Sequence, residues 1–529
     1  MSYKLSKSSL KRALNYLAKY GDTDIFPTLY EINFARVAVD EICDALSEVN
    51  ILAFEPAGAF EALAPKSRYG FRVSHQLPLL DNIFLLAAVI EIGALIEAKR
   101  RPPDEKAAFS YRFDQSSSNG IFLKDFAYRD WLQHQVETLA SNLKFKRVVA
   151  TDISDFYARV NFHRLENLLD TVAPHHGAAR YIKKAIKSIR AKQSFGLPVG
   201  GAAARILAEL ALVDIDNLLS QRGIAFTRFV DDFRLFLDER QRPYDVLALL
   251  GDALGITEGL SLNSSKTKVI ERTQYLRELR AASNDVLDEA EANALENLTA
   301  DIYFDDGEDP DPEDLEALSN LELLQMLKES LGGDELDFGR VKVIFRALKI
   351  VRPHEAVEFV RSNISELAIF AREVALLMAA LDEEWEGCFA DMADELVDLC
   401  LAEPASAVDL IRYWLLELFV RGIVPVDYRH LVRLGGLSDP ISQRQLILMK
   451  ARAGDVHFFR KGKSSFVSLN QAELPVFIVG STCLPRDEFM NMNVPTITSF
   501  GPLSSTFISW VRKNRETALD LFTVRNHED

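Results

Sequence analysis

The chain has 529 residues, of which 61 are Lys or Arg and 78 are Asp or Glu, so its net charge is −17. Its 48% hydrophobic and 26% charged residues are typical of a soluble globular protein and exclude a disordered chain, a collagen or a disulfide scaffold. At about 150 residues per domain, the length allows two to four domains.

The cellular compartment is predicted from what the sequence lacks. Apolar runs such as 83–90 are shorter than the ~20 residues that cross a bilayer, and the first twenty residues lack the apolar core of a signal sequence. The four cysteines are far apart and form no CxxC pair. We therefore expect a reduced, cytoplasmic protein that has no membrane partner.

The charge is distributed unevenly along the chain. Residues 1–272 contain 36 basic and 33 acidic side chains, a net charge of +3, whereas residues 273–529 contain 25 basic and 45 acidic side chains, a net charge of −20. A near-neutral half with local basic clusters can hold a polyanion, whereas the acidic half should repel one.

The first half of the chain alternates between helical and strand patterns. Short β-branched segments predict strands, and apolar residues at helical spacing predict helices. Strands are expected over 108–113 and 147–153, and as a pair joined by a tight turn over 225–237. Helices are expected over 1–50 around a Gly- and Pro-punctuated loop, and over 78–100, 131–143, 164–169, 180–192 and 202–219.

The second half of the chain has a different sequence pattern. The acidic run 301–313 has the composition of an exposed linker. Helical segments follow it, and their pairwise spacing suggests a HEAT-like array, although no residue-level repeat is visible. Short strands are expected at 466–469 and 476–479, before a final helix.

Residues suited to chemistry gather between 150 and 270. Asp152 ends a predicted strand, and the pair Asp231–Asp232 lies in the turn of the predicted hairpin. Mg²⁺ prefers oxygen ligands and takes one or two carboxylates plus substrate phosphates. Two such ions would stabilise the attacking and leaving oxygens of a phosphoryl transfer. Taken singly, each carboxylate is more often a surface turn or a helix cap.

A glycine-rich turn and a basic segment lie between these carboxylates. The turn at 194–201 allows the backbone to approach a base pair or a phosphate closely. Directly before it, a predicted helix places one row of cations on a single face, formed by Lys183, Lys184, Lys187 and Arg190. Such a row is either a solvated helix face or a contact for nucleic-acid phosphates.

The order and spacing of these motifs resemble the palm of reverse transcriptases. The resemblance implies that Asp152 and Asp231 bind both metals, with Asp232 as a weaker partner. It makes Tyr157 the steric gate that excludes a ribose 2′-hydroxyl, and it assigns the nucleotide contacts to Asp155, Phe156, Tyr157 and Gly200. The segment 196–200 matches the Leu-Pro-Gln-Gly turn of the family, except that Val199 replaces the Gln.

Two further roles are implied by the same resemblance. Lys266 matches a candidate general acid for the pyrophosphate leaving group, and its alternative is a solvated lysine beside a strand. Arg112 fits the fingers strand that grips the incoming triphosphate, and its alternative is a structural Arg paired with Asp114 or Asp125.

A narrower resemblance covers residues 1–272. The segments GDTDIFP, SYRF, TDISDFY, GLPVGGAAARILAE and FVDDF are similar to those of the abortive-infection and related defence-associated bacterial reverse transcriptases. The implied fold class is α+β, a right-hand polymerase fingers and palm followed by an all-α, HEAT-like domain. The corresponding domains are N-terminal helices and fingers at 1–150, palm at 151–275, acidic linker at 276–312 and helical domain at 313–529.

The resemblance also implies an activity. It predicts an RNA-directed DNA polymerase, a nucleotidyltransferase that uses two Mg²⁺ ions, with Mn²⁺ as a substitute. Its implied partners are dNTPs, RNA or nascent DNA, a non-coding RNA and further copies of itself, in phage defence. The resemblance leaves open whether synthesis is protein-primed or weakly templated. Some family members start DNA on a tyrosine, and fourteen tyrosines are present here. The alternatives are an RNA-making palm polymerase and a non-catalytic RNA-binding palm with a helical partner-docking domain.

Overall fold

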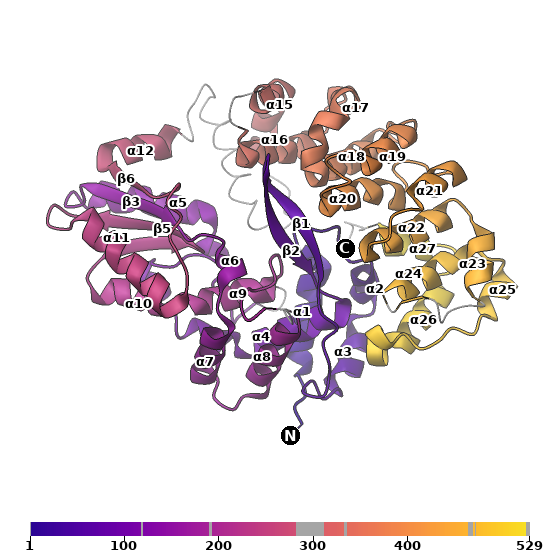
Figure 1. Ribbon diagram of the computed structural model, residues 1–529, viewed down its shortest axis with the longest axis horizontal. Coiled ribbons are helices and arrows are strands. Elements are labelled where there is room, and N and C mark those ends of the chain that lie inside the picture. Colours follow the sequence, from indigo (N-terminus) through magenta and orange to yellow (C-terminus); the bar gives the residue numbers. More distant parts are fainter. Residues whose placement is uncertain are drawn as a thin grey trace. The chain divides into compact units, whose positions relative to one another are not determined.

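The computed structural model describes two compact units, each assembled from separate stretches of the chain (Figure 1). Unit 1 comprises Met1–Tyr20, Val49–Gly58 and Ile83–Leu321, and unit 2 comprises Gly21–Glu48, Ala59–Asn82 and Glu322–Asp529. The residues that the structure describes are 2–117, 120–189, 193–281, 312–332, 336–463, 469–470 and 472–524.

A four-stranded antiparallel sheet organises unit 1. Its strands lie in the order β4 (Ala225–Phe229), β5 (Asp232–Leu237), β3 (Arg147–Asp152) and β6 (Lys268–Glu271). In β3 the β-branched Val148 and Val149 are fully buried, as expected of a central strand. The predicted strand at 147–153 and the predicted hairpin at 225–237 are therefore confirmed.

Helices cover this sheet and extend beyond it. The packing core on one face joins α5 (Tyr128–Ser141) and α12 (Arg272–Ala281) to the strands through Leu139, Phe236 and Tyr275. The other helices of unit 1 are α1 (Lys7–Tyr20), α6 (Phe156–Arg159), α7 (Phe162–Val172), α8 (Gly177–Ile189), α9 (Ala202–Ala211), α10 (Val213–Gln221), α11 (Pro243–Asp252) and α14 (Pro312–Asn320). The single helix expected over 202–219 is thus two helices, α9 and α10, that meet at Leu212.

Helix α4 (Leu79–Glu97) is the most apolar element of the first half. By length and composition it is the one helix among the described residues that could cross a membrane. However, 83% of its apolar window is buried inside the protein, and the core helix of a globular domain passes the same test. The expectation of a buried helix over 78–100 is confirmed.

Unit 2 is a stack of helices preceded by one β-hairpin. Its early elements are α2 (Glu31–Val37), α3 (Val39–Ser47) and the antiparallel pair β1 (Phe60–Ser67) and β2 (Gly70–Gln76). In the stack, alternate helices pack against one another in chain order (Figure 1), namely α16 (Phe338–Val351), α18 (Ala371–Glu384), α20 (Asp409–Val420), α22 (Pro440–Arg452) and α24 (Glu473–Gly480). Between and around these lie α15 (Leu323–Gly332), α17 (Glu355–Leu367), α19 (Ala393–Leu401), α21 (Tyr428–Leu434), α23 (Val456–Gly462), α25 (Arg486–Met490), α26 (Ser504–Lys513) and α27 (Ala518–Thr523).

Buried polar contacts fasten an N-terminal segment into this helical stack. The hydroxyl of Tyr30 donates a hydrogen bond of 2.7 Å to Glu417 on α20, and the indole of Trp414 donates one of 2.8 Å to the carbonyl of Ile25. Residues 21–48 and 59–82 therefore belong to unit 2. The predicted domain at 1–150 differs from this division, because contacts between residues more than 380 positions apart join the segment 21–48 to α20.

Three local expectations differ from the structure. The strand expected at 476–479 lies inside helix α24, because its apolar residues are buried among other helices and not along a sheet. The segment 108–113 forms only isolated bridges at Ala108 and Phe113, since Tyr111 has a positive φ of 50° that breaks an extended strand. Of the predicted linker at 276–312, residues up to 281 belong to α12, and residues 282–311 lie outside the described part of the chain. Most of the strand expected at 466–469 also lies outside it.

Replacing Tyr30 with Phe should destabilise unit 2. The substitution removes the donor to the buried carboxylate of Glu417, and a hydrogen bond to a charged group contributes about 1.5–3 kcal/mol. The free energy of unfolding, measured by urea titration, should fall by that amount. Tyr428→Phe is the matched control, because this tyrosine is 70% exposed. Equal stabilities of the two variants would contradict the importance of this contact.

Candidate active site

Three carboxylates lie together at one end of the sheet in unit 1. Asp152 is the last residue of β3 and is directly opposite Asp232, the first residue of β5. Asp231 lies in the two-residue turn between β4 and β5, and its carbonyl accepts a hydrogen bond of 3.2 Å from the amide of Ile153. The predicted meeting of Asp152 with the Asp231–Asp232 pair is therefore present in the structure.

The turn that carries Asp231 has an unusual backbone. Val230, the residue before Asp231, has a φ of +54°. A β-branched residue rarely adopts this left-handed conformation, and such strain persists only where neighbouring groups hold it. Here the hydroxyl of Ser110 accepts a hydrogen bond of 2.7 Å from the amide of Val230, and Arg228 donates one of 3.0 Å to its carbonyl. Both polar groups of the strained residue are thus held in place.

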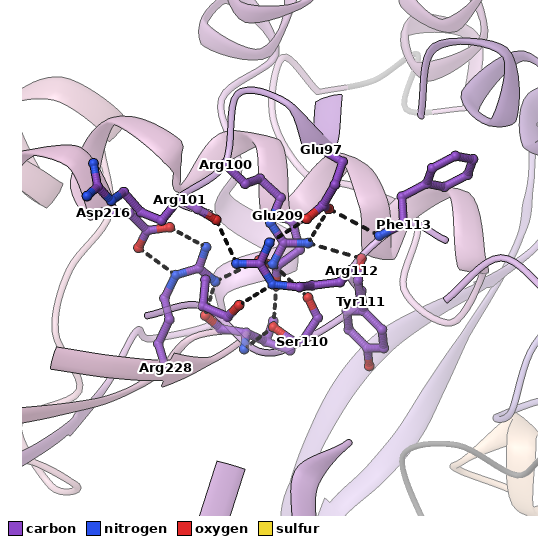
Figure 2. A network of polar contacts seen from close by, with 12 residues as sticks. Glu97, Arg100, Arg101, Ser110, Tyr111, Arg112, Phe113, Glu209, Asp216 and Arg228 are labelled. Atoms are coloured by element: carbon purple, nitrogen blue, oxygen red, sulfur yellow. Dashed lines mark hydrogen bonds and ion pairs between the residues drawn. The ribbon is translucent and has the colours of Figure 1, made fainter. Parts of the chain in front are cut away.

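Ser110 and Arg228, which hold the backbone of Val230, belong to one buried network of charged and polar side chains (Figure 2). Arg228 is fully buried and forms two 2.7 Å hydrogen bonds with Asp216 on α10. It also contacts Glu209 on α9 at 2.9 Å, and Glu209 accepts a hydrogen bond from Ser110. Burial opposes the charge of Arg228, yet the two carboxylates raise the pKa of its guanidinium above the ordinary value. The guanidinium of Arg228 therefore stays charged although it is buried.

Two further arginines complete the network (Figure 2). Arg100 contacts Glu209 at 2.8 Å and donates to the carbonyl of Ser110 at 2.8 Å. Arg112 pairs with Glu97 and donates to the carbonyls of Ala108 and Arg101. Three guanidinium groups thus meet three carboxylates, which balances the buried charge. Buried ion pairs are weak evidence for stability, so we interpret this network as one that fixes the geometry of the residues that it contacts.

The position of Arg112 corrects the expectation that it grips the triphosphate. Its side chain is fully buried, and its guanidinium nitrogens are engaged by Glu97 and by two carbonyls. The alternative of a structural arginine is the correct one, although its partner is neither Asp114 nor Asp125. An isolated arginine in an otherwise apolar segment gave no indication of which carboxylate would face it.

The carboxylates at the sheet end repel one another. Burial, together with the charges of Asp152 and Asp232, raises the pKa of Asp231 to about 7. Burial also raises the pKa of Asp232, and this rise is opposed by Arg234, which lies 3.5 Å away. Crowded carboxylates of this kind favour a bound cation.

Lys266 supplies one positive charge to this cluster. Its ammonium lies 3.0 Å from Oδ2 of Asp152, and the side-chain amide of Asn263 donates a hydrogen bond of 3.2 Å to the same oxygen. Although burial opposes it, the hydrogen bond and the charge of Asp152 raise the pKa of Lys266. The lysine is therefore protonated and next to the carboxylates, which is the state that a general acid requires.

The donor set suits a metal that is shared with a substrate. Within the part of the chain that the structure describes, no group of three or more His, Cys, Asp or Glu side chains forms a metal cage by itself. Mg²⁺ usually binds through one or two carboxylates plus substrate phosphates, so a closed protein cage is not required. Asp152 and Asp231, with Asp232 beside them, fit that arrangement.

The predicted nucleotide contacts come from two neighbouring segments. Asp155 is exposed, with a positive φ of 48°, and it directly precedes α6, which carries Phe156 and Tyr157. The carbonyl of Tyr157 accepts a hydrogen bond of 2.7 Å from Leu197, which ties α6 to the glycine-rich turn. Gly200 ends that turn with a φ of +121°, a conformation that favours glycine.

The hydroxyl of Tyr157 interacts electrostatically with Asp231 at the carboxylate end of the sheet. Burial raises its pKa well above the ordinary value, with further contributions from the charges of Tyr111, Glu209 and Asp231 and an opposing one from Arg205. The side chain that was predicted to act as the steric gate therefore lies within electrostatic reach of Asp231.

The basic face predicted on α8 is neutralised in the structure. Lys183 pairs with Asp170, Lys184 with Glu55 and Lys187 with Glu166, each at 2.6 Å. These three lysines do not form a free cationic surface, because acidic residues of the same unit face them. Arg190, the fourth predicted contact, lies outside the described residues.

The residues that hold the turn were missed by the sequence reasoning. Arg228 interrupts an apolar strand, and Glu209 is the one acidic residue in the apolar helix α9. A buried charge needs a partner, so these isolated charges in apolar elements were a usable signal.

Comparisons with known proteins agree with this geometry in unit 1. Residues 103–277 match the family model for reverse transcriptase (RNA-dependent DNA polymerase). No curated protein matches the chain. This part of the chain is thus similar to a reverse transcriptase domain, an α+β region that is followed here by a largely helical C-terminal region.

Similar solved structures include two telomerases. Apo telomerase from Candida tropicalis is 12% identical, with a TM-score of 0.33 over 68% of this chain and 69% of that chain. Telomerase from Candida albicans in complex with a TWJ fragment of telomeric RNA is 14% identical, with a TM-score of 0.31 over 68% of this chain and 66% of that chain. This chain spans about two thirds of the length of these telomerase chains.

Replacing Ser110 with Ala should loosen the turn that carries Asp231. The amide of Val230 would lose its acceptor, and an unsatisfied buried donor costs about 1–3 kcal/mol. Hydrogen exchange at the Val230 amide should therefore be faster by about tenfold to a hundredfold. Ser188→Ala is the matched control, because it also removes one serine hydrogen bond in unit 1, at 3.0 Å to the carbonyl of Pro56. Unchanged exchange at Val230 in Ser110→Ala would show that the strained turn does not need this acceptor.

Proposed function

We propose that this chain, which is similar to a reverse transcriptase domain over residues 103–277, is a DNA polymerase that adds dNTPs by two-metal phosphoryl transfer. The observation that carries the proposal is the meeting of Asp152, Asp231 and Asp232 at one end of the sheet, next to Lys266. Asp152 and Asp231 would hold the two metals, Mg²⁺ or Mn²⁺, and Asp232 would tune them. When bound, these ions neutralise the triphosphate and activate the attacking hydroxyl.

The chain's own residues position the substrate and move the proton. Tyr157, which follows Phe156 in α6, would exclude a ribose 2′-hydroxyl and so select dNTPs. Lys266 holds a proton next to Asp152, from where it can protonate the pyrophosphate leaving group. Asp155, Phe156 and Gly200 would contact the nucleotide. The contribution of the protein is positioning and charge stabilisation, as is general in phosphoryl transfer.

The biological role that we propose is anti-phage defence by a cytoplasmic, homo-oligomeric enzyme. It rests on the resemblance of residues 1–272 to defence-associated bacterial reverse transcriptases, together with the helical stack of unit 2, which we propose to be HEAT-like. In this proposal the enzyme starts DNA on one of its own tyrosines, and RNA, including a non-coding RNA, is its template or partner.

The proposal predicts that Asp231→Ala abolishes DNA synthesis. Purified protein is incubated with each labelled dNTP and Mg²⁺ or Mn²⁺, without primer or template, and is run on a denaturing gel. Label that stays with the 59.5 kDa band, resists RNase and is removed by DNase supports protein-primed synthesis. Asp245→Ala is the matched control, because it removes an exposed carboxylate from the first turn of α11.

Each other result has a defined meaning. Extension that requires an added RNA template and primer would replace protein priming with conventional reverse transcription. Synthesis that survives in Asp231→Ala would contradict the assignment of the site. If the wild-type chain incorporates no nucleotide with or without an added template and primer, but still binds RNA, a non-catalytic RNA-binding palm would be favoured.

Replacing Tyr157 with Ala should admit ribonucleotides. Removal of the ring relieves the clash with a 2′-hydroxyl, so the ratio of rNTP to dNTP incorporation should rise by about tenfold or more. Single-nucleotide addition with matched rNTP and dNTP measures this ratio. Tyr244→Ala, at an 87% exposed tyrosine on α11, should leave the ratio unchanged. No gain in Tyr157→Ala would favour an RNA-making polymerase or a gate elsewhere.

A further inference from the structure

The β1–β2 hairpin of unit 2 has a buried base and an exposed outer half. On one face of the ribbon, Ala62 and Ala64 are buried where β1 packs on α20. The side chain of Gln76 donates hydrogen bonds to Asp22 at 3.0 Å and to the carbonyl of Pro27 at 2.8 Å. The strands are thus anchored at one end, while their connecting turn at 68–69 is exposed.

The exposed half presents apolar side chains on one face of the ribbon. Leu63 pairs with Val73, and Pro65 pairs with Phe71, so these side chains share the face opposite to Ala62 and Ala64. Three of them are large and exposed, at 41% for Leu63, 43% for Val73 and 45% for Phe71. Tyr69, in the turn, is 85% exposed. An aromatic and apolar face of this kind indicates a binding surface.

The strands and turn of this hairpin also carry a net positive charge. Residues 62–74 contain Lys66, Arg68 and Arg72 and no acidic residue. Among the described residues, no carboxylate pairs with Arg68 or Arg72, and the guanidinium of Arg68 lies 6.0 Å from the ring centre of Tyr69. By contrast, the lysines of α8 are all neutralised. The turn therefore offers the unpaired charge of Arg68 next to the exposed ring of Tyr69, and Arg72 adds a second exposed cation on the face of the ribbon opposite to Phe71.

We propose that this hairpin binds single-stranded nucleic acid, with bases stacked on Tyr69 and Phe71 and phosphates held by Arg68 and Arg72. Stacking platforms flanked by cations are the general solution for single strands, because every base has a π-face and every nucleotide a phosphate. A two-stranded ribbon is also a known shape for nucleic-acid contacts. The cations favour this ligand over an apolar protein partner. The inference rests on the proposed function, which supplies template and product strands.

The test compares the affinity of the full-length chain for fluorescein-labelled oligo(dT) and oligo(rU). The variant Tyr69→Ala should bind at least about tenfold more weakly, whereas Tyr69→Phe keeps the ring and should bind as the wild type does. The double variant Arg68→Gln/Arg72→Gln should lose affinity and reduce the slope of log K against log salt by about 1.4, the value for two phosphate contacts on a single strand. A preference for one oligonucleotide would show whether the hairpin holds RNA or DNA.

The matched control is Tyr428→Ala/Arg429→Gln, on α21 of the same unit. This pair also combines an exposed tyrosine with an arginine, but Arg429 is neutralised by Asp427 at 2.9 Å. Its affinity and salt slope should stay at wild-type values. In the wild type, photocrosslinking with a 4-thiouridine-containing oligo(rU) should label residues 69–72.

Three results would overturn the proposal. They are unchanged affinity and salt slope in the hairpin variants, an equal loss in the control variant, or a changed oligomeric state at unchanged affinity, which would make the hairpin an interface between copies. The proposed function is tested separately by Asp231→Ala, which should abolish synthesis while oligonucleotide binding persists. If synthesis persists in Asp231→Ala, the polymerase assignment fails, whereas the affinities still decide the role of the hairpin.

Discussion

The buried guanidinium of Arg228 joins the carboxylates of two helices to the turn that carries Asp231. It pairs with Asp216 and Glu209, and it donates to the carbonyl of Val230, whose left-handed backbone would otherwise relax. Ser110 holds the amide of the same residue and is itself bonded to Glu209. The position of Asp231 therefore depends on helices α9 and α10, and not only on the strands that flank it.

This dependence explains why so much charge is buried beside a site that is itself negatively charged. The three site carboxylates repel one another, and burial together with the charges of Asp152 and Asp232 raises the pKa of Asp231 to about 7. A neutral network of three arginines and three carboxylates gives the surrounding scaffold a fixed geometry without adding net charge. Hydrophobic side chains could fill the same space, but they could not fix the two polar groups of Val230.

The sequence predicted the parts of the site that depend on local pattern. The strand ending at Asp152, the hairpin around Asp231 and the buried helix α4 all follow from short apolar periods and turn residues. It did not predict features set by distant partners. Arg112 faces Glu97 in place of a nucleotide, and Tyr30 is buried against Glu417, so residues 21–48 join the helical unit. Such pairings are decided by tertiary packing. They cannot be predicted from local patterns in a single sequence.

The charged residues show the same difference between what a local sequence pattern predicts and what tertiary contacts decide. On α8, the helical spacing of the lysines was a correct observation, but carboxylates on α7 and on the segment 49–58 neutralise them. On the β1–β2 hairpin, Arg68 and Arg72 form no conspicuous basic run in the sequence, yet the structure leaves both exposed, with Arg68 beside Tyr69. Attraction for a polyanion depends on the cations that the protein leaves unpaired, and not on the number that a segment contains. The number of lysines and arginines in a segment is therefore a poor guide to where nucleic acid would bind.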